Sequence, residues 1–135
     1  MIYKKSSLGL LIICVILGCF YISPKFQKFK ENNINKKIVN NCNMVADYIL
    51  KEYELNKKID LKTKVDESIE LFSGQVQNPV NSKQPAFTSQ ITEGACAVQY
   101  EESTKTVVVT GLALDESILV RIVLNPPTFI RYDRD

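Results

Sequence analysis

An uncharged apolar run close to the first residue is the feature that most constrains this chain. Leu8–Ile22 reads LGLLIICVILGCFYI, with Lys4 and Lys5 before it and Lys25 after it. As a helix, these fifteen residues would span about 22 Å, slightly less than the roughly 20 residues of a comfortable membrane span. We therefore expect residues 1–23 to form a membrane anchor or a signal-like segment.

Three interpretations of this segment compete. A cleaved secretory signal needs small residues at its cleavage site, but Ser23-Pro24-Lys25 follows the run. A lipoprotein signal is the second, because Ile16-Leu17-Gly18-Cys19 resembles a lipobox, in which the Cys is acylated and becomes the new N-terminus. A small apolar residue in a membrane helix is the simpler explanation of Cys19. The third interpretation is an uncleaved or pilin-type anchor whose helix continues into the folded domain.

The residues after the run favour a continuing helix. Apolar side chains recur every three or four residues over 24–56, with Lys and Asn between them, which is the pattern of one helix stripe. Pro24 stands where a first turn or a kink tolerates it. The stripe is too polar on its other faces to span lipid, so we expect it to pack on a sheet or on neighbouring helices. Its members are Phe26, Phe29, Ile34, Ile38, Cys42, Val45, Ile49 and Tyr53.

A short second helix and a loop are expected next. Apolar residues over 60–73 again follow a helical period. Thr63 and Asp66 resemble a capping pair, and Gly74 is a plausible end of this helix. Residues 75–87 are rich in Pro, Asn and Ser, which predicts a loop.

Strand signals dominate the remainder of the chain. Short β-branched and aromatic runs separated by short turns predict an antiparallel β-meander over 95–132. Helices followed by strands indicate an α+β fold, in which a long N-terminal helix has a membrane-embedded first part and an amphipathic second part. Residues 24–135 would then be one domain, with the amphipathic part packed on the meander. The expected strands are 95–101, 105–110, 117–124 and 129–132.

This organisation resembles type IV pilins and pseudopilins of the Gram-positive type. The resemblance begins with the basic start, the apolar helix and Pro24-Lys25-Phe26-Gln27 at its end. It continues with Asn78-Pro79-Val80 in a loop, the strands around 97–100 and 104–111, and Asp115. It covers most of the chain in organisation rather than in long motifs.

The resemblance implies a structural subunit, a divergent minor pilin or pseudopilin of a type IV pilus, competence or type II secretion-like assembly. Its partners would be membrane lipid and other pilin-like subunits, in self- or hetero-assembly. Lys5-Ser6-Ser7-Leu8 stands where the family has a Gly followed by Phe or Met, so Ser6 and Ser7 are the candidate processing region. The family's early Glu is also missing, since the first acidic residue is Glu31. The alternative is a membrane-anchored lipoprotein, acylated at Cys19, with a surface binding domain.

Composition argues against catalysis. The chain has no His, which removes the commonest general base and the commonest metal ligand. The acidic pairs Glu101-Glu102 and Asp115-Glu116 fall in expected turns, and no CxxC pair suggests a zinc site. We therefore expect no enzyme activity, no cofactor, no metal and no small-molecule substrate.

The distribution of charge bears on nucleic-acid binding and on the side of the membrane on which the C-terminal domain lies. The net charge is +2, and the chain after the apolar run is neutral, so we expect no nucleic-acid binding. Five lysines follow the run closely against two before it, and the positive-inside bias taken literally would keep the C-terminal domain in the cytoplasm. Dedicated machinery reads signal-like and pilin-like starts. We therefore expect a single-pass protein of the cell membrane with an extracytoplasmic C-terminal domain.

The four cysteines fall into two groups. Cys14 and Cys19 lie in the apolar run, whereas Cys42 lies on the helical stripe and Cys96 begins a strand. In an extracytoplasmic domain, a Cys42–Cys96 disulfide would link helix to sheet. It would close a loop of about fifty residues and contribute ~4 kcal/mol in the chain-entropy model. Two separately buried thiols are the alternative.

Overall fold

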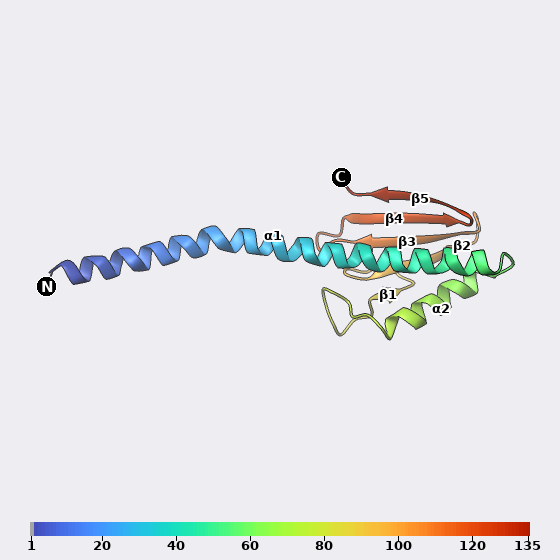
Figure 1. The fold of residues 1–135 in the computed structure, drawn as a ribbon, viewed down its shortest axis with the longest axis horizontal. Helices are drawn as coiled ribbons and strands as arrows, with labels where there is room; N and C mark the ends of the chain where they lie inside the picture. Colours follow the sequence, from blue (N-terminus) through green and yellow to red (C-terminus); the bar gives the residue numbers. More distant parts are fainter. Residues whose placement is uncertain (1) are drawn as a thin grey trace. The chain divides into compact units, whose positions relative to one another are not determined.

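The computed structural model describes residues 2–135, with side chains from Gly9 onward. It contains two compact units, one up to Asn33 and one comprising Ile34–Asp135. Helix α1 (Ile2–Leu55) begins in the first unit and ends in the second (Figure 1). Pro24 lies inside this helix, where it donates no backbone N–H.

The part of α1 that belongs to the second unit buries one stripe. Ile38, Cys42, Val45 and Ile49 are fully buried, and their spacing of four, three and four residues keeps them on one face of a helix. The expected stripe does not stay buried towards its beginning, because Phe26 is 64% and Phe29 is 63% exposed. The packed stripe is therefore shorter than the apolar pattern.

Helix α2 (Leu61–Ser73) is capped by a residue outside the expected capping pair. Asp60 is the N-cap, with an extended backbone (φ −80°, ψ 109°) from which its carboxylate accepts the N–H of Lys62 at 3.3 Å. The hydroxyl of Thr63 donates to the same carboxylate at 2.6 Å. The expected Thr63–Asp66 capping pair is thus wrong, since Thr63 bonds backwards to Asp60. Gly74 is the C-cap, and its N–H donates to the carbonyl of Phe72.

The sheet has five strands in sequence order. Neighbours from β2 to β5 pair antiparallel, so these four strands form a meander. The last strand, β5, stands at one edge, and all six of its residues are exposed. The strands are β1 (Phe87–Thr88), β2 (Cys96–Glu101), β3 (Thr106–Leu112), β4 (Ile118–Asn125) and β5 (Thr128–Asp133).

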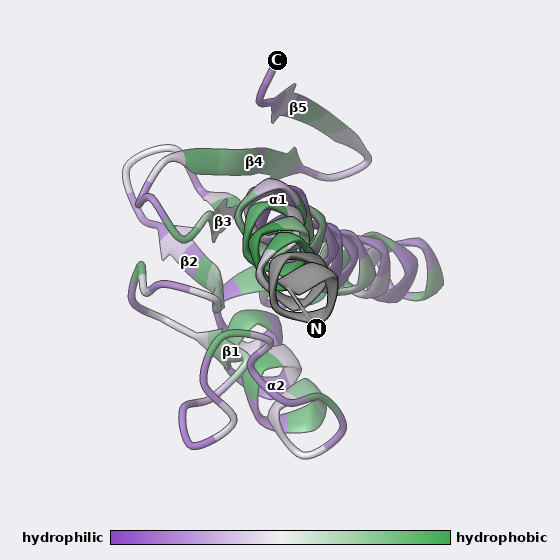
Figure 2. Ribbon diagram, turned by 90° about the vertical axis from the view of Figure 1, so that its left-hand side faces the viewer, coloured by the Kyte–Doolittle hydropathy of each residue, from purple (hydrophilic) through white to green (hydrophobic). Residues whose placement is uncertain are grey.

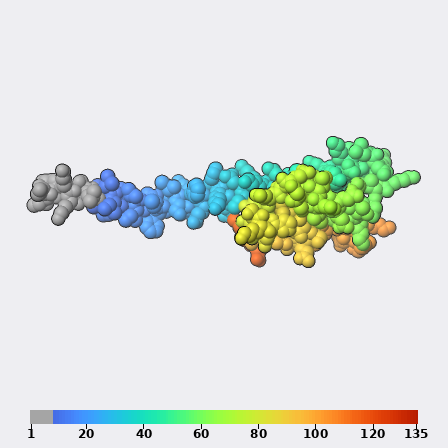
Figure 3. All heavy atoms as spheres, turned by 90° about the horizontal axis from the view of Figure 1, so that it is seen from below, coloured from blue at the N-terminus to red at the C-terminus, as the bar shows by residue number. Residues whose placement is uncertain are grey.

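Strand β1 is an addition to the expected meander. It pairs with β2 in parallel, Phe87 opposite Cys96 and Thr88 opposite Ala97. The N–H of Cys96 also donates to the carbonyl of Ala86 at 2.7 Å, which holds the end of the preceding loop against β2. Residue 87, expected in the loop, is therefore part of the sheet. Figure 3 shows α2 and the following loop, in yellow-green, gathered on one face of this unit.

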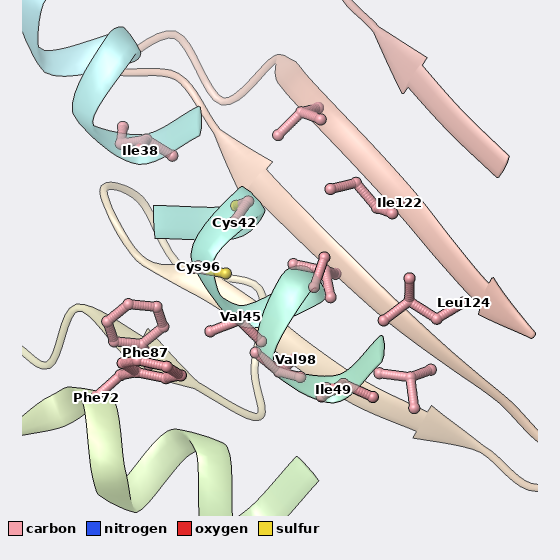
Figure 4. Packing of buried hydrophobic residues seen from close by; sticks show 14 of the residues in the cluster. Ile38, Cys42, Val45, Ile49, Phe72, Phe87, Cys96, Val98, Ile122 and Leu124 are labelled. Atoms are coloured by element: carbon pink, nitrogen blue, oxygen red, sulfur yellow. The ribbon is translucent and has the colours of Figure 1, made fainter. Parts of the chain in front are cut away.

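One hydrophobic core joins α1, α2 and the sheet within Ile34–Asp135 (Figure 4). Phe72 of α2 packs against Phe87, with ring centroids 5.5 Å apart, and meets Tyr48 of α1 edge-on at the same centroid distance. Apolar residues recur along β4, which is mainly green, the colour of hydrophobic residues, in Figure 2. The sheet contributes Phe87, Cys96, Val98, Val107, Val109, Leu119, Val120, Ile122 and Leu124 to this core.

The structure confirms the expected α+β class. A long N-terminal helix packs its second part on a small, mostly antiparallel sheet. The burial of apolar surface between these two layers is the main stabilising contribution, at roughly 1.5–3 kcal/mol for each large side chain taken out of water. This arrangement is compatible with a pilin-like fold.

Candidate functional site

The apolar half of α1 exposes a series of large apolar side chains. Its large side chains between Leu10 and Ile22 are 48% to 74% exposed, with Phe20 the most exposed. By length and composition this helix can cross a membrane. Exposed contiguous apolar surface of this extent marks a site of contact with lipid or with other proteins.

A Tyr–Lys pair marks the downstream end of the apolar half. Tyr21 and Lys25 are four residues apart, and the Nζ of Lys25 donates to the hydroxyl of Tyr21 at 3.2 Å. The same ammonium lies 4.5 Å from the centroid of the Tyr21 ring. A Tyr with an apolar ring and a polar tip, paired with a Lys whose charge can reach water, is typical of the boundary between hydrocarbon and headgroups.

The candidate modification residues of this half lie in one helix. Cys19 is exposed, and a side chain added at the adjacent Gly18 would meet nothing within 4 Å. Cys14 is exposed as well. Ser6 and Ser7, the candidate processing region, belong to α1 by their backbone, but their side chains lie outside the described residues. The structure therefore places these residues in a helix and does not test whether any of them is modified.

The other two cysteines meet in the core of the second unit. Cys42 on α1 and Cys96 at the start of β2 are both 0% exposed (Figure 4). The structure holds them as thiols. Burial raises the pKa of the Cys96 thiol well above its usual range, and a hydrogen bond with Cys42 raises this pKa further. The sequence-predicted pair is thus brought together.

Gly111 allows this close approach. It is the cross-strand partner of Cys96, and a Cβ at this position would lie 3.0 Å from the Sγ of Cys42 and 2.9 Å from Ile38. The strand register shifts directly after it, between Gly111 and Leu112. The absent side chain therefore makes room for α1 over the beginning of β2, and spacing alone could not have indicated this contact.

Asn78 organises the loop between α2 and the sheet. This side chain is only 3% exposed. Its Oδ1 accepts the backbone N–H groups of Val80 at 2.9 Å and Asn81 at 3.1 Å. Its Nδ2 donates to the carbonyls of Pro85 at 3.2 Å and Glu93 at 3.4 Å. A buried amide with both ends satisfied fixes a loop conformation, and we assign Asn78 this structural role.

A shallow groove separates α1 from the edge strand β5. Its apolar walls come from Ala46, Leu50 and Phe129, and it encloses about 250 Å³. Arg131 closes one side by donating to the Oδ1 of Asn43. The guanidinium also pairs with Asp133 at 2.6 Å. No local sequence pattern indicates this groove, because its walls come from segments some eighty residues apart.

The two acidic pairs are separated by the fold. Glu102 lies in the turn between β2 and β3 and pairs with Lys62 at 2.8 Å. Asp115 lies in the turn between β3 and β4, at the opposite end of β3. The side chain and N–H of Ser117 lower the pKa of Asp115. Among the described residues, no group of three His, Cys, Asp or Glu side chains is placed to hold a metal ion.

No family model, curated protein or solved structure matches this chain.

Proposed function

We propose that this protein is a membrane-anchored structural subunit, a divergent minor pilin or pseudopilin of a type IV pilus, competence or type II secretion-like assembly. One observation carries the proposal. A single helix combines an exposed, uncharged apolar half with an amphipathic half whose stripe is buried against a small antiparallel sheet. The proposal involves no substrate and no cofactor.

The apolar half needs a partner other than water. Ten large apolar side chains between Leu10 and Ile22 are exposed. Their transfer out of water would be favourable by on the order of 10 kcal/mol or more. Membrane lipid meets this need for a single chain. Apolar helices of other pilin-like subunits would meet it in a filament core, with the folded domains facing outward.

The proposed orientation places the folded domain outside the cytoplasm. Lys25, Lys28 and Lys30 follow the apolar run, and the positive-inside bias alone would oppose this orientation. The proposal instead follows the signal-like start, with a basic residue pair ahead of an apolar core. The missing early acidic residue argues for a minor or divergent subunit, because such a chain lacks the carboxylate with which its family docks neighbouring subunits.

The first experiment is the intact mass of the mature protein extracted from its native membrane. Cleavage next to Ser6 or Ser7, with N-methylation of the new terminus, supports the pilin-like subunit. A chain that begins at Cys19 and carries lipid establishes the lipoprotein with a surface binding domain. A full-length chain leaves a single-pass anchor whose membership in a filament is decided by cross-linking.

The cross-linking experiment places a photoreactive residue in the apolar half. Position Leu11 is 63% exposed and should link to other pilin-like subunits if the helices bundle. The control position Lys83 lies in an exposed loop of the folded unit and should give fewer links. If the photoreactive residue at position 11 gives adducts with lipid and none with protein, this result would contradict assembly.

A further inference from the structure

The buried thiol pair joins segments that are distant in the chain. Cys42 and Cys96 are 54 residues apart in sequence. Helix α2, its loop and β1 lie between them. Gly111 connects them, since Cys42 packs on Gly111 and Gly111 is the strand partner of Cys96. Figure 4 shows the two sulfurs on facing elements, one on the helix and one on the strand.

We infer that Cys42 and Cys96 form a disulfide while the domain folds outside the cytoplasm. The hydrophobic core then buries this disulfide. The inference rests on the extracytoplasmic side proposed above, and it does not require filament assembly. Disulfides persist in such compartments, whereas cytoplasmic thiols are kept reduced.

The chemistry is thiol–disulfide exchange with a protein disulfide donor, a thiol–disulfide oxidoreductase. The thiolate of one cysteine attacks the donor's S–S bond and forms a mixed disulfide, releasing one donor sulfur as a thiol. The second cysteine then attacks its partner's sulfur and releases the other donor sulfur as a thiol. The two protons lost by Cys42 and Cys96 end on the donor's thiols, and the donor is reduced by two electrons.

The order of events follows from burial. In the folded domain both sulfurs are fully buried, so neither an oxidoreductase nor a small reductant can reach them without opening the core. The raised pKa of Cys96 also keeps it protonated, and only the thiolate takes part in exchange. The bond therefore forms before the helix closes over the sheet and is protected afterwards.

The cross-link would fasten α1 directly to the first long strand. Without it, the contact depends on apolar packing along Ile38, Val45 and Ile49. With it, the unfolded chain keeps a large closed loop and loses conformational entropy, which favours the folded state. We expect reduction under denaturing conditions to be the only efficient way to free the two thiols.

Peptide mapping of the wild-type chain tests this directly. The protein is trapped with N-ethylmaleimide in denaturant, straight from native membranes, and is digested with trypsin without reduction. The expected product is peptide 38–51 linked to peptide 84–105, each of which contains one cysteine. Cys14 and Cys19 fall together in a third peptide and cannot be confused with this product. Maleimide on both Cys42 and Cys96, or either of them linked to another chain, overturns the inference.

A second set of measurements separates the disulfide from the orientation. In a variant with all four cysteines replaced, Lys83→Cys is labelled in whole cells by a membrane-impermeant maleimide if the domain is outside. If position 83 is labelled and Cys42 and Cys96 are free thiols in the parent chain, the disulfide is contradicted and the extracytoplasmic orientation is retained. If the parent chain has free thiols and position 83 is not labelled, both the disulfide and the extracytoplasmic orientation are contradicted.

Stability gives an independent readout of the same bond. For the full chain in detergent, reduction in denaturant followed by refolding should lower Tm by on the order of 10 °C. Cys42→Ala is the control, because reduction should not change its Tm. An unchanged Tm in the wild type after complete reduction would count against the cross-link.

Discussion

Gly111 of β3 lies directly under Cys42 of α1, so close that a Cβ at position 111 would stand 3.0 Å from the Cys42 Sγ. The helix rests on the sheet where a strand lacks a side chain.

The first prediction is that Gly111→Ala destabilises the folded unit by about 1–3 kcal/mol, because the added methyl overpacks a fully buried contact. Chemical denaturation of the full chain in detergent measures this change. Gly74→Ala is the matched control. A Cβ there meets nothing within 4 Å, and the backbone φ of −79° suits Ala. This control should be neutral or slightly stabilising, and equal losses in the two variants would contradict the packing explanation.

The second prediction is that Asn78→Ala costs about 1–3 kcal/mol, because it leaves buried backbone groups of the loop without their partners. Two N–H groups and two carbonyls lose a hydrogen bond with Asn78. Asn81→Ala is the control, since Asn81 is exposed and its side chain accepts the N–H of Lys83 within the same loop. Amide exchange across the loop should rise in the first variant only.

The third prediction concerns acid stability at the start of α2. The Thr63 hydroxyl, followed by the N–H groups of Lys62 and Thr63, lowers the pKa of Asp60 below its ordinary value. A carboxylate with a depressed folded-state pKa stabilises the protein above its unfolded pKa, and this contribution disappears as the pH falls through the lower folded value. Asp60→Asn should therefore flatten the stability profile below about pH 4. Unfolding curves over this acidic range measure the difference.

The control for this titration is Asp66→Asn, which removes an exposed carboxylate further along the same helix. Its profile should keep the acid-dependent loss of the wild type. Identical flattening in both variants would mean that general charge, and not the cap, sets the acid response.

The fourth prediction is that Leu17→Arg releases the chain from the membrane fraction or blocks its insertion. A charged side chain at the middle of an apolar helix raises the insertion free energy by roughly 2.5–3.5 kcal/mol. Asn32→Arg, further along the same helix and beyond the apolar run, should leave the distribution unchanged. Alkaline extraction of membranes followed by immunodetection measures it, and retention of both variants would argue against a membrane role for this half.

The sequence was most informative where one physical pattern decides the structure. The spacing of Ile38, Cys42, Val45 and Ile49 indicates a helix face, and those side chains are fully buried. The β-branched run around Val107–Val109 likewise indicates a strand, and it lies in β3. In both cases the periodicity reflects a face that turns towards apolar neighbours.

Other features depend on contacts that no local pattern carries. Two residues, Phe87 and Thr88, are too few to show strand periodicity, and their place in the sheet depends on register with Cys96 and Ala97. The length of the buried stripe was overestimated, because Phe26 continues the helical spacing of Ile38 and yet its side chain is 64% exposed. The N-cap was misplaced because the Thr63 hydroxyl donates to Asp60, three residues before it, and not to Asp66, three residues after it, and the residue types alone do not decide between these two carboxylates.

Strand β5 has a consequence for how the sheet opens. It pairs with β4 on one side only, so every second residue directs its N–H and C=O to solvent, and all six residues are exposed. Local opening should begin at this margin and proceed inward through β4, while β3, which pairs with both β2 and β4, exchanges its amide hydrogens last. The strand at the open margin is thus the least protected part of the sheet, and the strand that meets Cys42 is among the most protected.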